Sequence, residues 1–144
     1  MKKLMMIGKV SCGKTTLTQY LNNKELSYKK TQALEVMGNV IDTPGEYVER
    51  RQYYQALEVT AMGADVVLLL QDPLDMTFTL PPGMKAMFQK PFVGVITKID
   101  KVDDSKLIER AGKMLELAGA HPIFPISSVT GEGVDALVNY LTEL

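Results

Sequence analysis

The chain has 144 residues and a formal net charge of −1, with 46% hydrophobic and 23% charged residues. This length suits one domain that buries about two-thirds of its unfolded surface, so we expect a single domain over residues 1–144. The near-zero charge gives no attraction for nucleic acid or an anionic membrane, and a single cysteine excludes an internal disulfide framework. No apolar run approaches the ~18 residues of a membrane helix, and we expect a cytoplasmic protein without membrane insertion.

The stretch from residue 4 to residue 21 predicts a strand, a glycine-bounded loop and a helix. A short apolar run suits a buried strand, and apolar residues at helical spacing follow the loop. The loop carries the P-loop pattern G-x-x-x-x-G-K-[ST], whose backbone N–H groups and helix N-terminus bind phosphate. Lys14 is expected to reach the β- and γ-phosphates. The nucleotide-binding residues predicted here are Gly8, Lys9, Val10, Ser11, Cys12, Gly13, Lys14, Thr15 and Thr16.

Two single residues in the chain leave alternatives open. Cys12 is either a small loop residue or a reactive thiol, because a helix N-terminus lowers the pKa of a thiol. His121 is expected at the surface or at a strand edge rather than in catalysis.

The remainder of the chain predicts alternating strands and helices. Polar residues 22–30 predict a loop, followed by antiparallel strands over 32–37 and 40–42. Charged residues 46–51 are expected to be mobile, and helices are expected over 52–62, 83–88, 105–118 and from 134 onward. Further strands are expected over 64–70, 92–96 and 122–126. This order predicts a three-layer α/β/α fold around a mostly parallel six-stranded sheet with one antiparallel strand.

Five segments resemble, in order and approximate spacing, the five boxes of small GTP-binding proteins. The short length and the stretches GKVSCGKTTL, DTPGEY, VITKID and TGEGVDAL are most similar to the ethanolamine-utilisation EutP and propanediol-utilisation PduV family. The resemblance implies a small P-loop G-domain in bacterial ethanolamine or propanediol catabolism, associated with a microcompartment. The five boxes are residues 8–15, Thr31, residues 42–45, residues 97–100 and residues 127–128.

The resemblance implies that the cofactors are Mg²⁺ and GTP or GDP. Thr15, Thr31 and Asp42 would hold the metal, with Thr31 engaged only when the triphosphate is bound. A carboxylate at a strand end suits a hard cation such as Mg²⁺. Gly45 would meet the γ-phosphate through its N–H group.

The resemblance also implies a base-reading loop. Lys98 and Asp100 would bind guanine, because a carboxylate accepts two hydrogen bonds that adenine does not offer. Backbone N–H groups around Ser127 and Ser128 would meet the guanine carbonyl. The family pattern has asparagine where this chain has Thr97, and we expect the change to loosen the connection to the P-loop and weaken affinity.

Lys14 and Glu46 are the candidate catalytic residues. Ras-like proteins place a water-orienting glutamine where this chain has Glu46, whose carboxylate either acts on water as a base or is repelled by the γ-phosphate. We therefore expect slow hydrolysis assisted by a protein partner that binds through the loops near Thr31 and Glu46.

Three functions remain open on the sequence. The first is a GTP-binding switch that hydrolyses GTP slowly. The second is a small-molecule phosphotransferase that uses ATP and an acceptor such as acetate, as an acetate kinase does. The third is an interaction module that binds nucleotide for structure, with the segment 46–51 and the methionines Met76, Met84 and Met87 as its surface.

Overall fold

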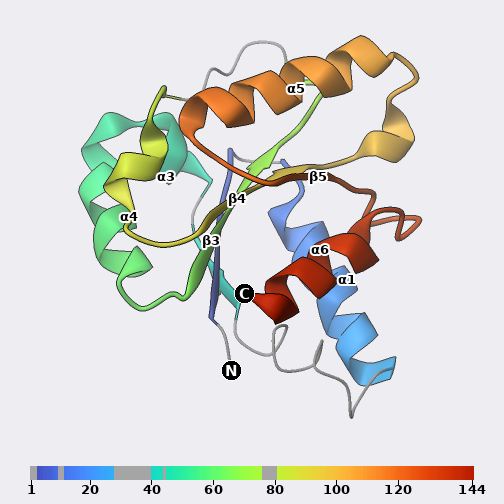
Figure 1. Ribbon diagram of the computed structural model, residues 1–144, viewed down its shortest axis with the longest axis horizontal. Helices are drawn as coiled ribbons and strands as arrows, with labels where there is room; N and C mark the ends of the chain where they lie inside the picture. Colours follow the sequence, from blue (N-terminus) through green and yellow to red (C-terminus); the bar gives the residue numbers. More distant parts are fainter. Residues whose placement is uncertain (1–2, 10–11, 28–39, 44, 76–80) are drawn as a thin grey trace.

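A computed structural model describes residues 3–9, 12–27, 40–43, 45–75 and 81–144 of the chain. Its centre is a five-stranded parallel sheet with the order β2-β1-β3-β4-β5 (Figure 1). The predicted strand over 32–37, which carries the antiparallel pairing, lies outside the described residues. The strands are β1 (Leu4–Ile7), β2 (Val40–Asp42), β3 (Val66–Gln71), β4 (Phe92–Ile96) and β5 (Ile123–Pro125).

Helices cover both faces of this sheet, which gives the predicted three layers (Figure 1). On one face lie α1 (Lys14–Ser27) and α6 (Val134–Glu143), and on the other lie α3 (Glu46–Glu49), α4 (Tyr54–Ala61) and α5 (Ser105–Ala118). The side chain of Asp104 caps α5 by accepting from the Lys106 N–H group, and Gly119 ends it with φ 98°. The described residues also form three 3₁₀ turns: η1 (Arg51–Tyr53), η2 (Met84–Met87) and η3 (Ile99–Lys101).

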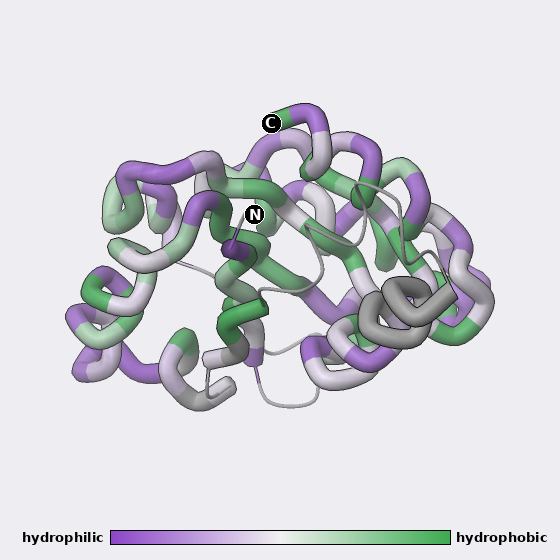
Figure 2. Tube along the Cα trace, turned by 90° about the horizontal axis from the view of Figure 1, so that it is seen from below, coloured by the Kyte–Doolittle hydropathy of each residue, from purple (hydrophilic) through white to green (hydrophobic). Residues whose placement is uncertain are grey.

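Alternate strand residues feed two separate cores. Leu4 and Met6 of β1 face α1 and α6, while Met5 and Ile7 face α4 and α5. Because both faces are covered, the central strands are continuous apolar runs rather than alternating ones. In Figure 2 the central strands are mostly hydrophobic, whereas hydrophobic and hydrophilic residues alternate along the helices. In the part of the chain that the structure describes, no helix is long and apolar enough to cross a membrane.

Two predicted loops are helical in the structure. Helix α1 continues to Ser27, although residues 22–27 were expected to belong to a loop because they are polar. A helix whose outer side is solvated is polar as well, so composition alone does not separate the two. Residues 46–49 form the short helix α3 where a mobile segment was expected, and the Val48 side chain of this helix is buried in the core. The predicted helix over 83–88 is the short turn η2, where Met84 is buried in the core; Met76 lies outside the described residues.

Candidate nucleotide site

The P-loop joins the end of β1 to the start of α1, at the rim where the parallel strands end. Gly8 has no room for a side chain: a Cβ there would collide with Cys12 Sγ and lie 3.2 Å from the Leu70 carbonyl oxygen. Gly13 has φ 113°, a left-handed conformation that side chains rarely adopt. The path of the main chain therefore requires glycine at both positions of the motif.

Lys14 turns its ammonium group into this loop. Its side chain is only 7% exposed, and Nζ donates a hydrogen bond of 2.9 Å to the Gly8 carbonyl oxygen. The next two residues, Thr15 and Thr16, are exposed in the first turn of α1. This arrangement places one cation and the N-terminus of a fourteen-residue helix on the same side of the loop.

Cys12 is a core residue rather than a reactive thiol. It is 3% exposed and packs with the cluster between the sheet, α1 and α6. Burial raises the pKa of the Cys12 thiol, and this effect exceeds the opposing effect of the nearby Lys14 ammonium group. Of the two interpretations of Cys12, the structure supports the small buried loop residue.

Thr97 connects the base loop to the P-loop. Its hydroxyl donates a hydrogen bond of 2.5 Å to the Cys12 carbonyl oxygen and lies 3.4 Å from the Gln71 carbonyl oxygen. The Thr97 side chain is buried against Gly13. A Cβ atom added to Gly13 would lie only 3.3 Å from the Thr97 Cβ atom. Thr97 thus connects the base loop to the P-loop directly, and the expectation that threonine makes a looser connection than asparagine stays a prediction. The expected loss of affinity stays a prediction.

Asp100 is held by Ser127, which belongs to the predicted segment 127–128. The Ser127 hydroxyl donates to Asp100 Oδ1 at 2.8 Å and accepts from the backbone N–H groups of Val129 and Thr130 at 3.2 and 3.0 Å. Ser127 is fully buried, whereas Asp100 is exposed and Ser128 is half-buried. The hydroxyl uses one of the four acceptor positions of the carboxylate, so the others remain for a ligand with two donors.

Lys98 has two features that the sequence did not reveal. Its backbone has φ 58°, the only left-handed non-glycine conformation among the described residues. Its Nζ forms an ion pair of 2.9 Å with Asp72 Oδ2. Asp72 directly follows β3, and this place at the carboxyl end of a buried strand is the sequence signal that could have identified it.

Two cavities along this rim form one crevice because they share lining residues. One cavity lies against the base loop, and the other lies against the P-loop and the first turn of α1. Lys101, which was not predicted as a site residue, lines both. The shared residues are Gly13, Thr16, Lys98 and Lys101; the first cavity also has Thr97, Asp100, Ser128 and Val129, and the second has Lys14 and Thr15.

The end of the crevice beside the P-loop offers a hard oxygen donor, the Thr15 hydroxyl. Thr15 is exposed there, and Asp42 ends β2 opposite Met6 of β1. Among the described residues, no three His, Cys, Asp or Glu side chains gather in a metal site. The Thr15 hydroxyl is of a kind that binds Mg²⁺, which is usually held by one or two protein oxygens together with phosphates and water.

The remaining predicted residues do not line the crevice or are not described. Val10, Ser11 and Thr31 lie outside the described residues, as do the side chains of Asp42 and Glu46. Gly45 is described and directly precedes α3, with φ −58°. His121 is exposed, as expected.

Comparison with known proteins identifies the relatives of the chain. The family PduV-EutP, described as "Ethanolamine utilisation - propanediol utilisation", matches residues 1–143. The propanediol utilization protein PduV of Citrobacter freundii is 37% identical over 98% of this chain and 93% of its own. A protein of Escherichia coli K12 named "Probable acetate kinase EutP" is 33% identical over 100% of this chain and 91% of its own.

A solved structure has the same fold. The GTPase Era of Aquifex aeolicus, in a structure bound to GDP.AlF4-, aligns with a TM-score of 0.62 at 22% identity. The alignment covers 99% of this chain and 57% of the Era chain, so the chain spans little more than half of Era. The likeness confirms the P-loop α/β/α fold.

Proposed function

Because this chain belongs to the PduV-EutP family of ethanolamine and propanediol utilisation proteins, we propose that it is a slow, Mg²⁺-dependent GTPase switch within that metabolism. The observation that carries the proposal is the Asp100 carboxylate, fixed by the Ser127 hydroxyl at one end of the crevice. Cytoplasmic location, association with a bacterial microcompartment and a single domain over residues 1–144 belong to the same proposal.

The base end supports a preference for guanine. Asp100 would accept from the N1–H group and the exocyclic amine of guanine, while backbone N–H groups near Ser128 would donate to its carbonyl oxygen. Adenine lacks this pair of donors and would leave the carboxylate unpaired, which makes binding unfavourable. Thr97 keeps the base loop against Cys12, so the distance between the base and phosphate positions is fixed by the chain.

The phosphate end supports binding of a triphosphate. Lys14 would exchange the Gly8 carbonyl oxygen for oxygens of the β- and γ-phosphates, a stronger charge-assisted contact. Thr15, Asp42 and Thr31 would hold Mg²⁺, which neutralises charge that develops on the phosphates. Gly45 would donate its N–H group to the γ-phosphate. Binding would thereby fix the positions of the segment near Thr31 and of α3, which begins at Glu46, and we propose these two segments as the contact for a protein partner.

Competition binding tests this function. GTP, GDP, ATP and ADP are competed against a fluorescent guanine nucleotide with Mg²⁺, on the natural protein and on Asp100→Asn. We expect a guanine preference of about 100-fold or more, lost in the variant. Asp103→Asn is the matched control, because Asp103 is exposed and does not line the crevice. Equal competition by ATP, unchanged by Asp100→Asn, would refute guanine recognition.

A second candidate is a phosphotransferase that passes the γ-phosphate to a small carboxylate such as acetate. The observation that favours it is the name of the relative from Escherichia coli, "Probable acetate kinase EutP", which matches the whole chain. The discriminating assay supplies GTP or ATP with acetate and measures acetyl phosphate and inorganic phosphate in the same sample. Phosphate release that acetate does not change supports the GTPase, whereas acetyl phosphate formation abolished by Lys14→Ala supports the kinase.

A further inference from the structure

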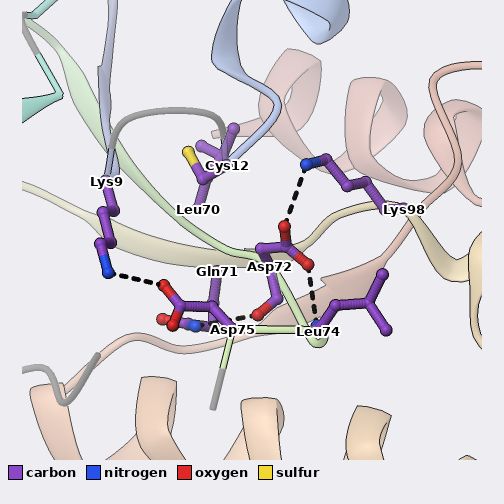
Figure 3. A pocket seen from close by; sticks show the side chains of 8 residues that line it. All are labelled: Lys9, Cys12, Leu70, Gln71, Asp72, Leu74, Asp75 and Lys98. Carbon is purple, nitrogen blue, oxygen red and sulfur yellow. Dashed lines mark hydrogen bonds and ion pairs between the residues drawn. The ribbon is translucent and has the colours of Figure 1, made fainter. Parts of the chain in front are cut away.

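Beside the P-loop lies a third cavity, outside the crevice that we assign to the nucleotide. Its volume is about 270 Å³, and it shares only Lys98 with the nucleotide crevice (Figure 3). Both P-loop and β3 contribute to its wall. The lining residues are Lys9, Cys12, Leu70, Gln71, Asp72, Leu74, Asp75 and Lys98.

Gln71 gives this cavity an unmet acceptor. The residue is 2% exposed, and its Nε2 donates to the Asp72 carbonyl oxygen at 3.0 Å. Its Oε1 is buried without a hydrogen-bond partner, the only such side-chain atom among the residues that the structure describes. Buried polar atoms nearly always have partners. The terminal torsion of glutamine is soft, so a small turn of the amide presents Oε1 to a donor in the cavity.

Two ion pairs form opposite walls of the cavity (Figure 3). Lys9 Nζ lies 3.2 Å from Asp75 Oδ2, and Lys98 Nζ lies 2.9 Å from Asp72 Oδ2. The charges of these four side chains cancel, so the cavity favours neither anions nor multiply charged ligands, and its carboxylates can accept hydrogen bonds from a hydroxyl or a single ammonium group. Leu70 and Leu74 supply apolar surface to the lining.

We propose that this cavity binds a short vicinal diol or amino alcohol. One hydroxyl or amino group would donate to Gln71 Oε1, the adjacent polar group would bind Asp72 or Asp75, and the two or three carbons would contact Leu70 and Leu74. Ethanolamine and propanediol, the compounds in the family description, both belong to this chemical class. The cavity is thus a sensor site for a small metabolite.

The position of the cavity couples this ligand to the nucleotide, a step that rests on the proposed function. Lys9 and Cys12 belong to the P-loop and Lys98 belongs to the base loop, so occupancy would bias elements of the nucleotide site. The coupling is reciprocal: a ligand that changes GDP affinity has its own affinity changed by GDP by the same factor.

Nuclear magnetic resonance of the full chain tests binding directly. Ethanolamine and 1,2-propanediol are titrated separately into ¹⁵N-labelled protein, with 1-propanol as the probe that lacks a second polar group. A ligand with four or five heavy atoms binds at micromolar affinity at best, so the titration extends to tens of millimolar. We expect saturable shifts of the Gln71 side-chain amide and of the Asp72 and Leu74 backbone amides, with at least one of the two probes and not with 1-propanol.

Variants locate the site. Gln71→Leu removes the acceptor, and we expect affinity to fall about 3- to 10-fold, which is the range of one neutral hydrogen bond. Gln55→Leu is the matched control, because Gln55 is exposed on α4. If Gln71→Leu does not fold, Asp75→Asn replaces it, with the same expected direction. Absence of saturable shifts, equal binding of 1-propanol, or unchanged affinity in the folded variant would overturn the proposal.

The two proposals fail separately. Guanine nucleotide binding with no saturable binding of either probe overturns the sensor site and leaves the GTPase proposal intact. Probe binding without guanine preference supports the sensor site and overturns the GTPase proposal. Probe binding that leaves GDP affinity within 2-fold of its unliganded value overturns the coupling.

Discussion

The base end and the phosphate end of the crevice are held in different ways. At the base end, Thr97, Lys98 and Asp100 are fixed by groups 85, 26 and 27 residues away in the chain. At the phosphate end, Lys14 contacts a carbonyl oxygen only six residues away, in its own loop. Under the proposed function, long-range contacts would therefore position the groups that read the base, whereas the contact of Lys14 is local and could be exchanged for phosphate. Such an arrangement would keep the preference for one base while the P-loop changes its contacts on phosphate binding.

The largest effect is expected from a substitution that disrupts the phosphate end alone. Lys14→Ala removes the cation that would bind the β- and γ-phosphates, and we expect GTP affinity to fall about 100-fold through loss of charge-assisted hydrogen bonds. Fluorescent nucleotide titration measures it, with Lys113→Ala on the exposed side of α5 as control. A change below 3-fold would contradict a phosphate role for Lys14.

Ser127→Ala breaks the base end. The variant frees Asp100 and leaves the N–H groups of Val129 and Thr130 without their acceptor. We expect the guanine preference to fall about 10-fold and the free energy of unfolding to fall by about 1–3 kcal/mol. Competition binding and urea denaturation measure the two effects, and Ser105→Ala, on an exposed serine, is the control. Unchanged preference would mean that Ser127 does not position Asp100.

Thr97→Val sharpens the comparison by cutting the connection between the ends. The Cys12 carbonyl oxygen would lose its donor at nearly constant side-chain volume, so we expect a loss of about 1 kcal/mol in stability. We also expect GDP to bind a few-fold more weakly, because the two ends are no longer held in register. Thr97→Ser keeps the hydroxyl and should restore both quantities; failure to do so would assign the effect to packing.

The sequence predicted the frame of the fold because its signals are local. Apolar runs identified β3 and β4, and Asp104 and Gly119 marked the ends of α5. The extension of α1 to Ser27 was missed because its polar residues suit a loop as well as a solvated helix. The P-loop and the base loop were predicted from sequence motifs. The Lys98–Asp72 ion pair and the unpaired Gln71 acceptor depend on side chains that meet only in the fold, so no spacing predicted them.

The smallest expected effect concerns the buried thiol between the two ends. Burial raises the pKa of Cys12 in the folded chain, so the unfolded chain releases its proton at a lower pH. Stability from this group is present below the unfolded thiol pKa of about 8.5 and is lost as pH rises from there toward the folded value. Denaturation at pH 7 and pH 10 should show a steeper loss for the natural protein than for Cys12→Ala. The native thiol should also react with Ellman's reagent far more slowly at pH 7 than the denatured one.

The segment that follows Gly45 carries its own optical reporter. The rings of Tyr47 and Tyr53 stack with centroids 4.6 Å apart and planes 11° from parallel, and Tyr54 donates to the Val48 carbonyl oxygen beside them. The chain has six tyrosines and no tryptophan, so half of its tyrosines lie in this one segment. Tyrosine emission depends on the surroundings of the ring and is not masked here by indole. Fluorescence of the unlabelled protein can therefore show in real time whether this segment moves when nucleotide is added.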